Sequence, residues 1–172
     1  MRKSNIVLIG FMGSGKTTFG RKLSSRLHYK FVDMDRYLEK REGRSITEIF
    51  ALEGEEGFRR IETEVVKELA NRDLTVIATG GGVIKSAENM ELLEEKGVVV
   101  YLKATPEHIY RNIGQDKSRP LLQGKDKMEK IRSLMKERLS IYEQYGQVTI
   151  DVSFGTVSQI TDRIIQALEE WI

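Results

Sequence analysis

The residues with the clearest chemical meaning lie in the segment GFMGSGKTT, which begins where the apolar run NIVLIG ends. Gly10, Gly15, Lys16 and Thr17 match the pattern G-x-x-x-x-G-K-[ST] between a predicted strand and a predicted helix. Such glycines let backbone N–H groups surround phosphate oxygens, while Lys16 reaches the outer phosphates and Thr17 offers Mg²⁺ a hydroxyl. A glycine-rich turn with a surface lysine is the structural alternative. The segment predicts ATP or GTP binding, and the absence of the guanine-reading tetrapeptide N-K-x-D favours adenine.

Two aspartates follow the second predicted strand, in the segment DMD. Asp33 ends the strand and Asp35 lies two residues further, so an extended chain would point both carboxylates the same way. Ligands of open α/β sheets bind at the carboxyl ends of the strands. We expect one carboxylate to serve Mg²⁺ and the other to hold or deprotonate an attacking hydroxyl. The alternative interpretation is that Asp35 merely caps the following helix.

Arg138 occupies an unusual place on a long predicted helix. Ile131, Met135, Arg138 and Tyr142 follow the i, i+4, i+7, i+11 spacing of one helix face, which puts the arginine in line with apolar neighbours. Such an arginine either holds an anion or snorkels, with its stem packed and its head in water.

Arg59 lies beside Phe58 in the segment GEEGFRRIE, near the start of a predicted helix, where a cation opposes the helix dipole. This place suggests an arginine that holds an anion, and an ordinary surface arginine is an equally good interpretation. Two forked guanidinium groups, those of Arg59 and Arg138, would suit a carboxylate, which they can bind bidentately.

A polar stretch, GQDKSRPLLQGKDK, interrupts the regular pattern and predicts a mobile lid over about 112–127. Arg119 lies in it, just before Pro120. An arginine on a lid can close on a transferring phosphate, and a solvated basic loop is the alternative.

Three consecutive glycines, Gly80 to Gly82, follow the apolar run TVIAT, and no lysine follows them to make a second phosphate loop. Bare backbone at this point lets a polyhydroxylated ring approach N–H groups without meeting a β-carbon. A tight strand-to-helix turn would explain one glycine better than three.

The elements that must position these residues alternate between short apolar strands and amphipathic helices, over a single domain, 1–172. The pattern predicts an α/β fold with a five-stranded parallel sheet covered by helices on both faces. The predicted strands are 5–10, 30–33, 75–79, 98–104 and 147–153. The predicted helices cover about 16–27, 34–71 with breaks at Gly43 and Gly54, 86–96, a segment from Pro106 on, 127–144 and 156–170.

Composition narrows the class of protein. The 172 residues carry 31% charged side chains but a net charge of only +2, without the basic excess of nucleic-acid-binding proteins. No apolar run approaches the roughly 20 residues of a membrane helix. The absence of cysteine agrees with a reducing compartment. We therefore expect a cytoplasmic protein that binds neither nucleic acid nor membrane. Composition does not report the oligomeric state, for which we expect a monomer.

Taken in order, GFMGSGKTT, DMD, GEEGFRRIE, TGGG, SRPLL and ERLSIY resemble the shikimate kinase family over residues 10 to 142. The resemblance implies a three-layer P-loop NTPase fold of the adenylate-kinase type with a mobile lid. It also implies transfer of the ATP γ-phosphate to the 3-hydroxyl of shikimate, with Mg²⁺, in the pathway to aromatic amino acids. The segment of about 34–71 would then be the substrate-binding insertion.

The resemblance also assigns roles to individual residues. Catalysis would fall to Lys16, Asp35 and Arg119, and Mg²⁺ would be served by Thr17 and by Asp33 through water. Shikimate would be held by Asp35, Arg59, Gly80, Gly81, Gly82 and Arg138. ATP would be held by Gly13, Ser14, Gly15, Lys16, Thr17, Thr18, Arg111, Arg119 and Ser153. The segment DVSFG (151–155) departs from the family, whose adenine site often has a proline there, and Ser153 and Phe154 would replace it.

Other interpretations share parts of this pattern. Kinases of gluconate or of nucleoside monophosphates carry the phosphate loop, but DMD, TGGG and the two arginine segments together are not expected in a gluconate kinase. A regulatory or assembly ATPase would need an apolar strand that ends in an acid, and the third strand ends in TGGG instead. A homologue without kinase activity, used as a nucleotide-binding module, is a further alternative. His28 and His108 are isolated, and we expect them to be structural or surface residues.

Overall fold

The computed structural model describes residues 1–113 and 126–172, and all five strands form one parallel sheet in the order β2-β3-β1-β4-β5. The strands are β1 (Asn5–Ile9), β2 (Lys30–Asp33), β3 (Thr75–Ala78), β4 (Gly97–Lys103) and β5 (Val148–Asp151). The predicted parallel sheet is confirmed. Strands buried on both faces need continuous apolar runs, and β1 is completely buried.

Seven α-helices lie in the described residues, and their bounds follow the predicted segments closely. They are α1 (Lys16–Leu27), α2 (Met34–Glu42), α3 (Ile46–Ala70), α4 (Ala87–Lys96), α5 (Pro106–Ile113), α6 (Lys127–Tyr145) and α7 (Val157–Leu168). A short 3₁₀ turn, η1 (Val83–Lys85), was not predicted from the sequence. No helix of the described residues is long and apolar enough to cross a membrane.

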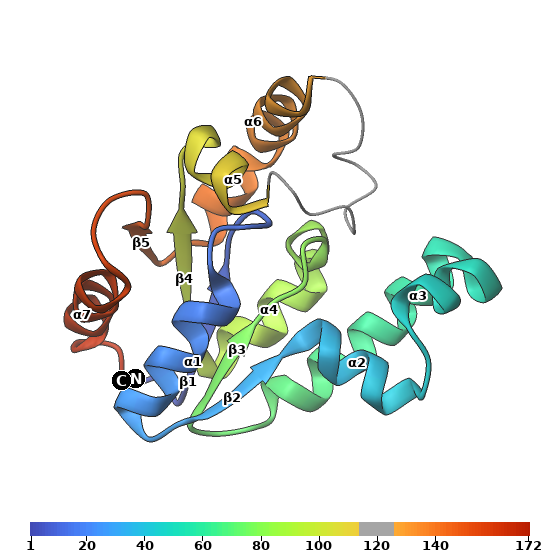
Figure 1. Cartoon of the computed structure of the whole chain (residues 1–172). Helices are drawn as coiled ribbons and strands as arrows, with labels where there is room; N and C mark the ends of the chain where they lie inside the picture. Colours follow the sequence, from blue (N-terminus) through green and yellow to red (C-terminus); the bar gives the residue numbers. More distant parts are fainter. Residues whose placement is uncertain (114–125) are drawn as a thin grey trace.

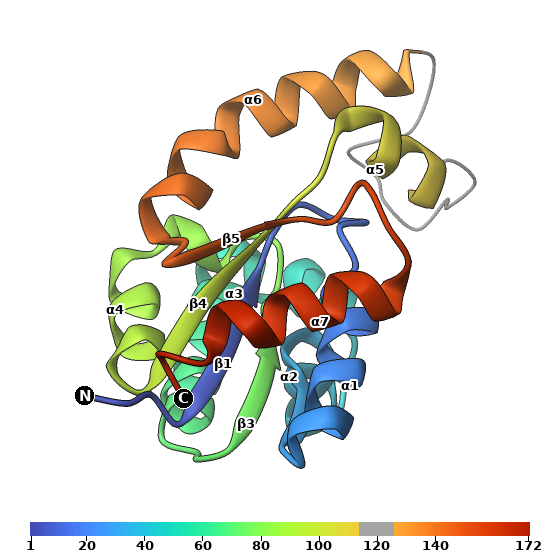
Figure 2. The ribbon, with the colours of Figure 1, turned by 90° about the vertical axis from the view of Figure 1, so that its left-hand side faces the viewer.

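The helices form two layers on the sheet. In Figure 2, α7 and α1 lie on the viewer's side, and α3 and α4 lie behind the strands. The buried apolar side chains of the strands and of both helical layers form one continuous core. Figure 1 shows α2 and the first half of α3 extending beyond β2, the edge strand, so this helical pair borders the carboxyl end of the sheet.

Local sequence signals explain where α3 begins and bends. Ser45 caps the helix: its side chain accepts from the Glu48 backbone N–H, and the Glu48 side chain accepts from the Ser45 backbone N–H. At Gly54 the backbone leaves the helical region, with φ 70° and ψ −176°, a conformation available to glycine. The predicted breaks at Gly43 and Gly54 are confirmed, and the bend turns the second half of α3 back over the sheet, against α4.

The strand register brings three sequence motifs to one edge. Asp33 of β2 and Leu8 of β1 both pair with Ala78 of β3, so the three strands end at the same level. The phosphate loop follows β1, the DMD segment spans the end of β2, and the glycine triplet follows β3. The predicted meeting of these motifs at the carboxyl ends of the strands is therefore confirmed.

The condition under which both DMD carboxylates would point the same way is not met. The chain does not stay extended after Asp33, because α2 begins at Met34, whose side chain is completely buried. Asp33 caps this helix, and its Oδ1 accepts a hydrogen bond from the Arg36 backbone N–H at 3.2 Å. The cap is thus Asp33 rather than Asp35, which lies in the first turn of α2.

Gly97 provides a test of how tightly β4 packs. A β-carbon built there would lie 2.6 Å from the Leu93 carbonyl oxygen and 2.7 Å from Val7 Cγ2. Because a backbone carbonyl cannot move aside easily, we expect Gly97→Ala to lower the free energy of unfolding by about 1–3 kcal/mol in urea denaturation.

Gly43→Asn is the matched control for Gly97→Ala. Gly43 has a left-handed φ of 68°, and nothing lies within 4 Å of a β-carbon built there. Asparagine tolerates this conformation, so we expect a change smaller than about 1 kcal/mol. Equal losses in the two variants would contradict the packing argument.

Candidate active site

The phosphate loop uses glycine where the backbone turns out of the ordinary region. Gly10, Gly13 and Gly15 have φ values of 157°, 80° and 98°. A β-carbon at Gly10 would also lie 2.9 Å from the Leu102 carbonyl oxygen, so both conformation and space require glycine there. The Lys16 ammonium lies over this loop and donates to the Gly10 carbonyl at 2.6 Å.

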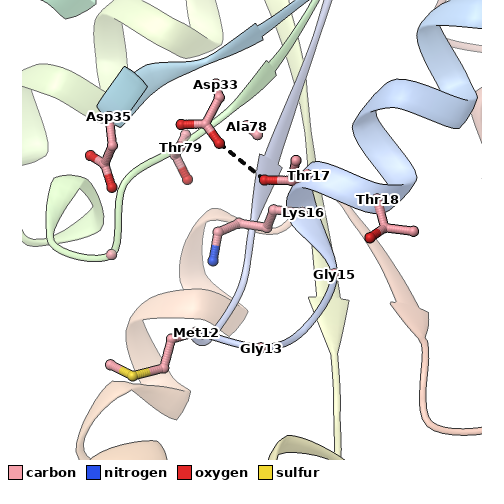
Figure 3. Close-up of a pocket in the computed structure, with 11 residues that line it drawn as sticks. Met12, Gly13, Gly15, Lys16, Thr17, Thr18, Asp33, Asp35, Ala78 and Thr79 are labelled. Carbon is pink, nitrogen blue, oxygen red and sulfur yellow. Dashed lines mark hydrogen bonds between the residues drawn. The ribbon is translucent and has the colours of Figure 1, made fainter. Parts of the chain in front are cut away.

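A cavity of about 300 Å³ opens beside this loop at the carboxyl ends of β1, β2 and β3. Figure 3 shows the Lys16 ammonium on one side of it and the Asp33, Asp35 and Thr79 side chains on the other. The cavity therefore brings a cation that can hold phosphate close to two carboxylates. Its lining residues are Met12, Gly13, Gly15, Lys16, Thr17, Thr18, Asp33, Asp35, Ala78, Thr79 and Gly81.

The oxygen atoms of Thr17 and Asp33 form one side of this cavity. Thr17 Oγ1 donates a hydrogen bond to Asp33 Oδ2 at 3.0 Å, as Figure 3 shows. A hydroxyl and a carboxylate are hard oxygen donors of the kind Mg²⁺ prefers when phosphate oxygens and water complete its shell. The pair fits a magnesium nucleotide. No cluster of three or more acidic or histidine side chains suited to a resident metal occurs in the described residues.

Asp35 has the most perturbed acidity in the cavity. The pKa of Asp35 is raised from 3.8 to about 6, chiefly by burial and then by the negative charges of Asp33 and Glu62, while the positive charge of Lys16 opposes the shift. A carboxylate in the first turn of a helix normally gains from the helix dipole, but burial among other acids outweighs that effect here. A carboxyl group whose pKa lies this close to neutral pH, at the site where an acceptor would lie, is suited to hold or remove a proton.

Two of the three glycines after β3 make room for a side chain, and the third faces one. A β-carbon at Gly80 would lie 2.6 Å from Asp35 Oδ1, and one at Gly82 would lie 2.6 Å from both terminal nitrogens of Arg59. Gly81 faces the third side chain, because a β-carbon there would lie 3.7 Å from Arg138 Nη1. The sequence suggested space for a ligand ring. The structure adds that the space also admits the groups that would hold the ligand.

Arg59 is held in place by a buried carboxylate. Arg59 Nη1 lies 2.8 Å from Glu62 Oε1, and the Glu62 side chain is only 2% exposed. The guanidinium also lies over the Phe58 ring, at 5.2 Å from its centroid. Burial raises the pKa of Glu62, and the hydrogen bond from Arg59 lowers it. Glu62 was not singled out in the sequence, where it resembles any helical surface acid.

Arg138 is 8% exposed and comes from α6, on the other side of the glycines. Its Nη1 donates to the Gly81 carbonyl at 3.3 Å, and its guanidinium lies 5.7 Å from the centroid of the Phe11 ring. A snorkelling side chain would reach open water, and this one does not. The predicted convergence of Arg59, Arg138 and Asp35 at the glycine triplet is therefore observed.

A second cavity, of about 400 Å³, lies on the other side of the phosphate loop, between α5 and the start of α7. His108 and Asn112 line it. Asn112 Nδ2 donates to the Gly13 carbonyl at 2.8 Å and lies 3.0 Å from His108 Nε2. The sequence predicted only a structural or surface role for His108 and did not single out Asn112, because the place of both depends on how α5 packs against the loop.

The remaining predicted nucleotide residues lie elsewhere. Arg111 is exposed on α5 and does not line either cavity. Ser153 Oγ accepts a hydrogen bond from the Thr105 backbone N–H at 2.8 Å, a contact that joins the ends of β4 and β5. Arg119 and most of the predicted lid lie outside the described residues. Ser14 lines the second cavity, and its Oγ is buried without a hydrogen bond among the described residues.

Comparisons with known proteins agree on one family. Residues 12–169 match the family model described as shikimate kinase. A shikimate kinase of Caldanaerobacter subterraneus subsp. tengcongensis is 45% identical over 95% of each chain, and one of Vibrio campbellii is 43% identical over 98% of each.

Solved structures give the same result. A shikimate kinase from Acinetobacter baumannii in complex with shikimate has a TM-score of 0.89 and 41% identity, over 98% of this chain and 94% of that one. A gluconokinase from Sinorhizobium meliloti has a TM-score of 0.63 and 18% identity, over 99% of this chain and 94% of that one, a likeness in fold alone.

Because the pKa of Asp35 is raised on folding, its ionised carboxylate lowers the stability of the folded state. Removing the charge should restore that stability. A carboxyl whose pKa is raised on folding destabilises the folded state as pH rises from the unfolded value, 3.8, through the folded value of about 6. Asp35→Asn should therefore be more stable than the parent by about 2–3 kcal/mol at pH 8, with the difference vanishing below about pH 4. Urea denaturation at several pH values measures this, and a constant difference across the range would contradict it.

Proposed function

The chain belongs to the shikimate kinase family, and we propose how its strand-end cavity carries out that family's reaction. The protein is an ATP-dependent kinase that transfers the γ-phosphate to the 3-hydroxyl of shikimate, giving shikimate 3-phosphate and ADP. What supports the assignment of individual roles is the meeting of Asp35, Arg59 and Arg138 at Gly80–Gly82, directly beside a phosphate loop.

On the donor side, backbone N–H groups from Gly13 to Thr18 hold the phosphates of ATP at the N-terminus of α1. Lys16 moves from the Gly10 carbonyl to the outer phosphates, where its charge offsets the charge on the transferring group. Arg119 adds a second positive charge from the lid. Thr17 and Asp33 would hold Mg²⁺, Asp33 through water, and the ion would supply positive charge to the phosphate oxygens.

On the acceptor side, Arg59 and Arg138 bind the carboxylate of shikimate from two directions. Asp35 accepts a hydrogen bond from the ring hydroxyl that attacks, and takes its proton as the new O–P bond forms and the bond to ADP breaks. The backbone of Gly80, Gly81 and Gly82 lines the same space. All these groups come from one chain, so we also propose a monomer, working in the cytoplasm where ATP is supplied.

The other acceptors considered from the sequence have less support. A gluconate kinase shares the fold at 18% identity, which says nothing about the acceptor. A nucleotide-binding module without activity would have no need for two nearly buried or paired arginines around three glycines.

The acceptor can be tested directly. We expect ADP release with Mg-ATP to depend on shikimate and to stay at the level without acceptor when gluconate, AMP or CMP is supplied. A coupled assay for ADP measures this, and mass spectrometry identifies shikimate 3-phosphate. Activity with gluconate or a nucleotide but not with shikimate would overturn the assignment.

The glycine triplet provides a second test. In Gly82→Ala the new methyl group displaces the Arg59 guanidinium, whose nitrogens lie 2.6 Å from the β-carbon position. Loss of charge-assisted hydrogen bonds should raise the KM for shikimate about tenfold or more, with a much smaller change in the KM for ATP.

Gly81→Ala is the matched comparison for Gly82→Ala, because the nearest heavy atom to its β-carbon position lies at 3.7 Å, an ordinary contact distance. Its effect on the KM for shikimate should be clearly smaller. Equal effects of the two substitutions would mean that Arg59 is not what Gly82 accommodates.

A further inference from the structure

Tyr142 carries a buried hydroxyl without a hydrogen-bond partner among the described residues. The residue is 2% exposed, and its Oη makes no hydrogen bond in the described part of the chain. Buried tyrosine hydroxyls nearly always find a partner, because a buried polar group without one loses the hydrogen bonds it had in water. A native structure that keeps such a group calls for an explanation.

The ring of Tyr142 is fixed, so the hydroxyl cannot turn away to find a partner. It stacks on the Tyr101 ring of β4, with centroids 5.0 Å apart and planes 13° from parallel. The stack joins α6 to the sheet. The position of Oη is therefore set by the packing of the core rather than by a choice of rotamer.

The charged group near this hydroxyl is Arg138, one turn earlier on α6. Burial raises the pKa of Tyr142 above its ordinary value, and the Arg138 guanidinium opposes the shift by its charge and by its approach to the hydroxyl, which falls short of hydrogen-bond geometry. The contacts of Arg138 itself are loose: a 3.3 Å hydrogen bond to the Gly81 carbonyl and the Phe11 ring at 5.7 Å. It forms no ion pair within residues 1–113 and 126–172. A guanidinium has five N–H donors, so it has donors left for a ligand and for Tyr142.

The surroundings favour a neutral partner. Tyr142 and Phe11 border an apolar cavity of about 430 Å³, whose described lining contains lysine and arginine but no acid. Arg59 differs, because it is paired with the buried Glu62 carboxylate at 2.8 Å. A hydroxyl can orient a guanidinium without cancelling its charge, so the full charge of Arg138 stays available to an anionic ligand.

We propose that Tyr142 is a positioning residue for Arg138: its Oη accepts a hydrogen bond from the guanidinium when that group turns to grip the carboxylate of shikimate. This rests on the role proposed above for Arg138. With Tyr142 on one side and the Gly81 carbonyl on the other, the fork is held in the plane needed for bidentate binding. The loss of freedom on binding shikimate is then smaller.

Tyr142→Phe tests this, because it removes the hydroxyl and keeps the stacked ring. We expect the KM for shikimate to rise about five- to tenfold, within the range for a hydrogen bond to a charged group, while the KM for ATP stays within about twofold. The matched control is Tyr101→Phe, which removes the hydroxyl from the other ring of the same stack. It should leave both KM values nearly unchanged.

A shikimate analogue with a primary alcohol in place of the carboxylate separates orientation from a general structural role. Because Arg138 then has no carboxylate to grip, Tyr142→Phe should no longer change the KM relative to the parent protein. The proposal is overturned if the substitution raises the KM for both acceptors alike, raises the KM for ATP as much as that for shikimate, or has no effect.

The activity, the carboxylate role of Arg138 and its coupling to Tyr142 can be tested separately. A parent protein that does not phosphorylate shikimate would overturn the activity itself. An Arg138→Ala variant with an unchanged KM for shikimate would overturn the carboxylate role of Arg138. If Arg138→Ala raises that KM, Tyr142→Phe is then introduced into the Arg138→Ala variant. If it raises the KM for shikimate there by the same factor as in the parent protein, the two residues are not coupled and the proposal is overturned.

Discussion

The absence of β-carbons at Gly80 and Gly82 is the constraint on which the proposed acceptor site depends. Asp35, Arg59 and Arg138 come from α2, α3 and α6, three helices far apart in the sequence, and they meet at the end of β3. Methyl groups at Gly80 and Gly82 would take the positions that Asp35 and Arg59 now approach to within 2.6 Å. The bare backbone of Gly80–Gly82 thus lets three charged side chains lie against the same short segment.

The charges of these three side chains are compensated to different degrees by their neighbours. Arg59 has a buried carboxylate partner, whereas Arg138 lies between a carbonyl and an aromatic ring. Asp35 is surrounded by other acids, and burial keeps its pKa near 6. Arg59 is thus paired, whereas Arg138 keeps a charge that no carboxylate of the described residues neutralises. Such a site is less stable than a fully paired one, and in the proposed function the remaining charge recognises a hydroxylated carboxylate.

The sequence predicted the donor site far better than the details of the acceptor site. The phosphate loop is a local motif, and strands and caps follow from short signals such as the apolar run at β1 and the Ser45 capping box. The arginines could be found because each was out of place in its helix. Glu62 and Tyr142 could not, because their roles depend on which helix packs opposite. The DMD segment is not extended, because α2 begins directly after Asp33 and buries Met34.

This difference has a physical basis in how each side binds. The donor site is mostly backbone N–H groups at a helix N-terminus, a geometry that a short glycine pattern encodes and that any nucleoside triphosphate can use. The acceptor site is made of side chains brought by three helices. A fold can therefore be shared with a gluconokinase at 18% identity while its acceptor differs, since a change in α2, α3 or α6 alters the acceptor groups and leaves the strand-end loop of β1 intact.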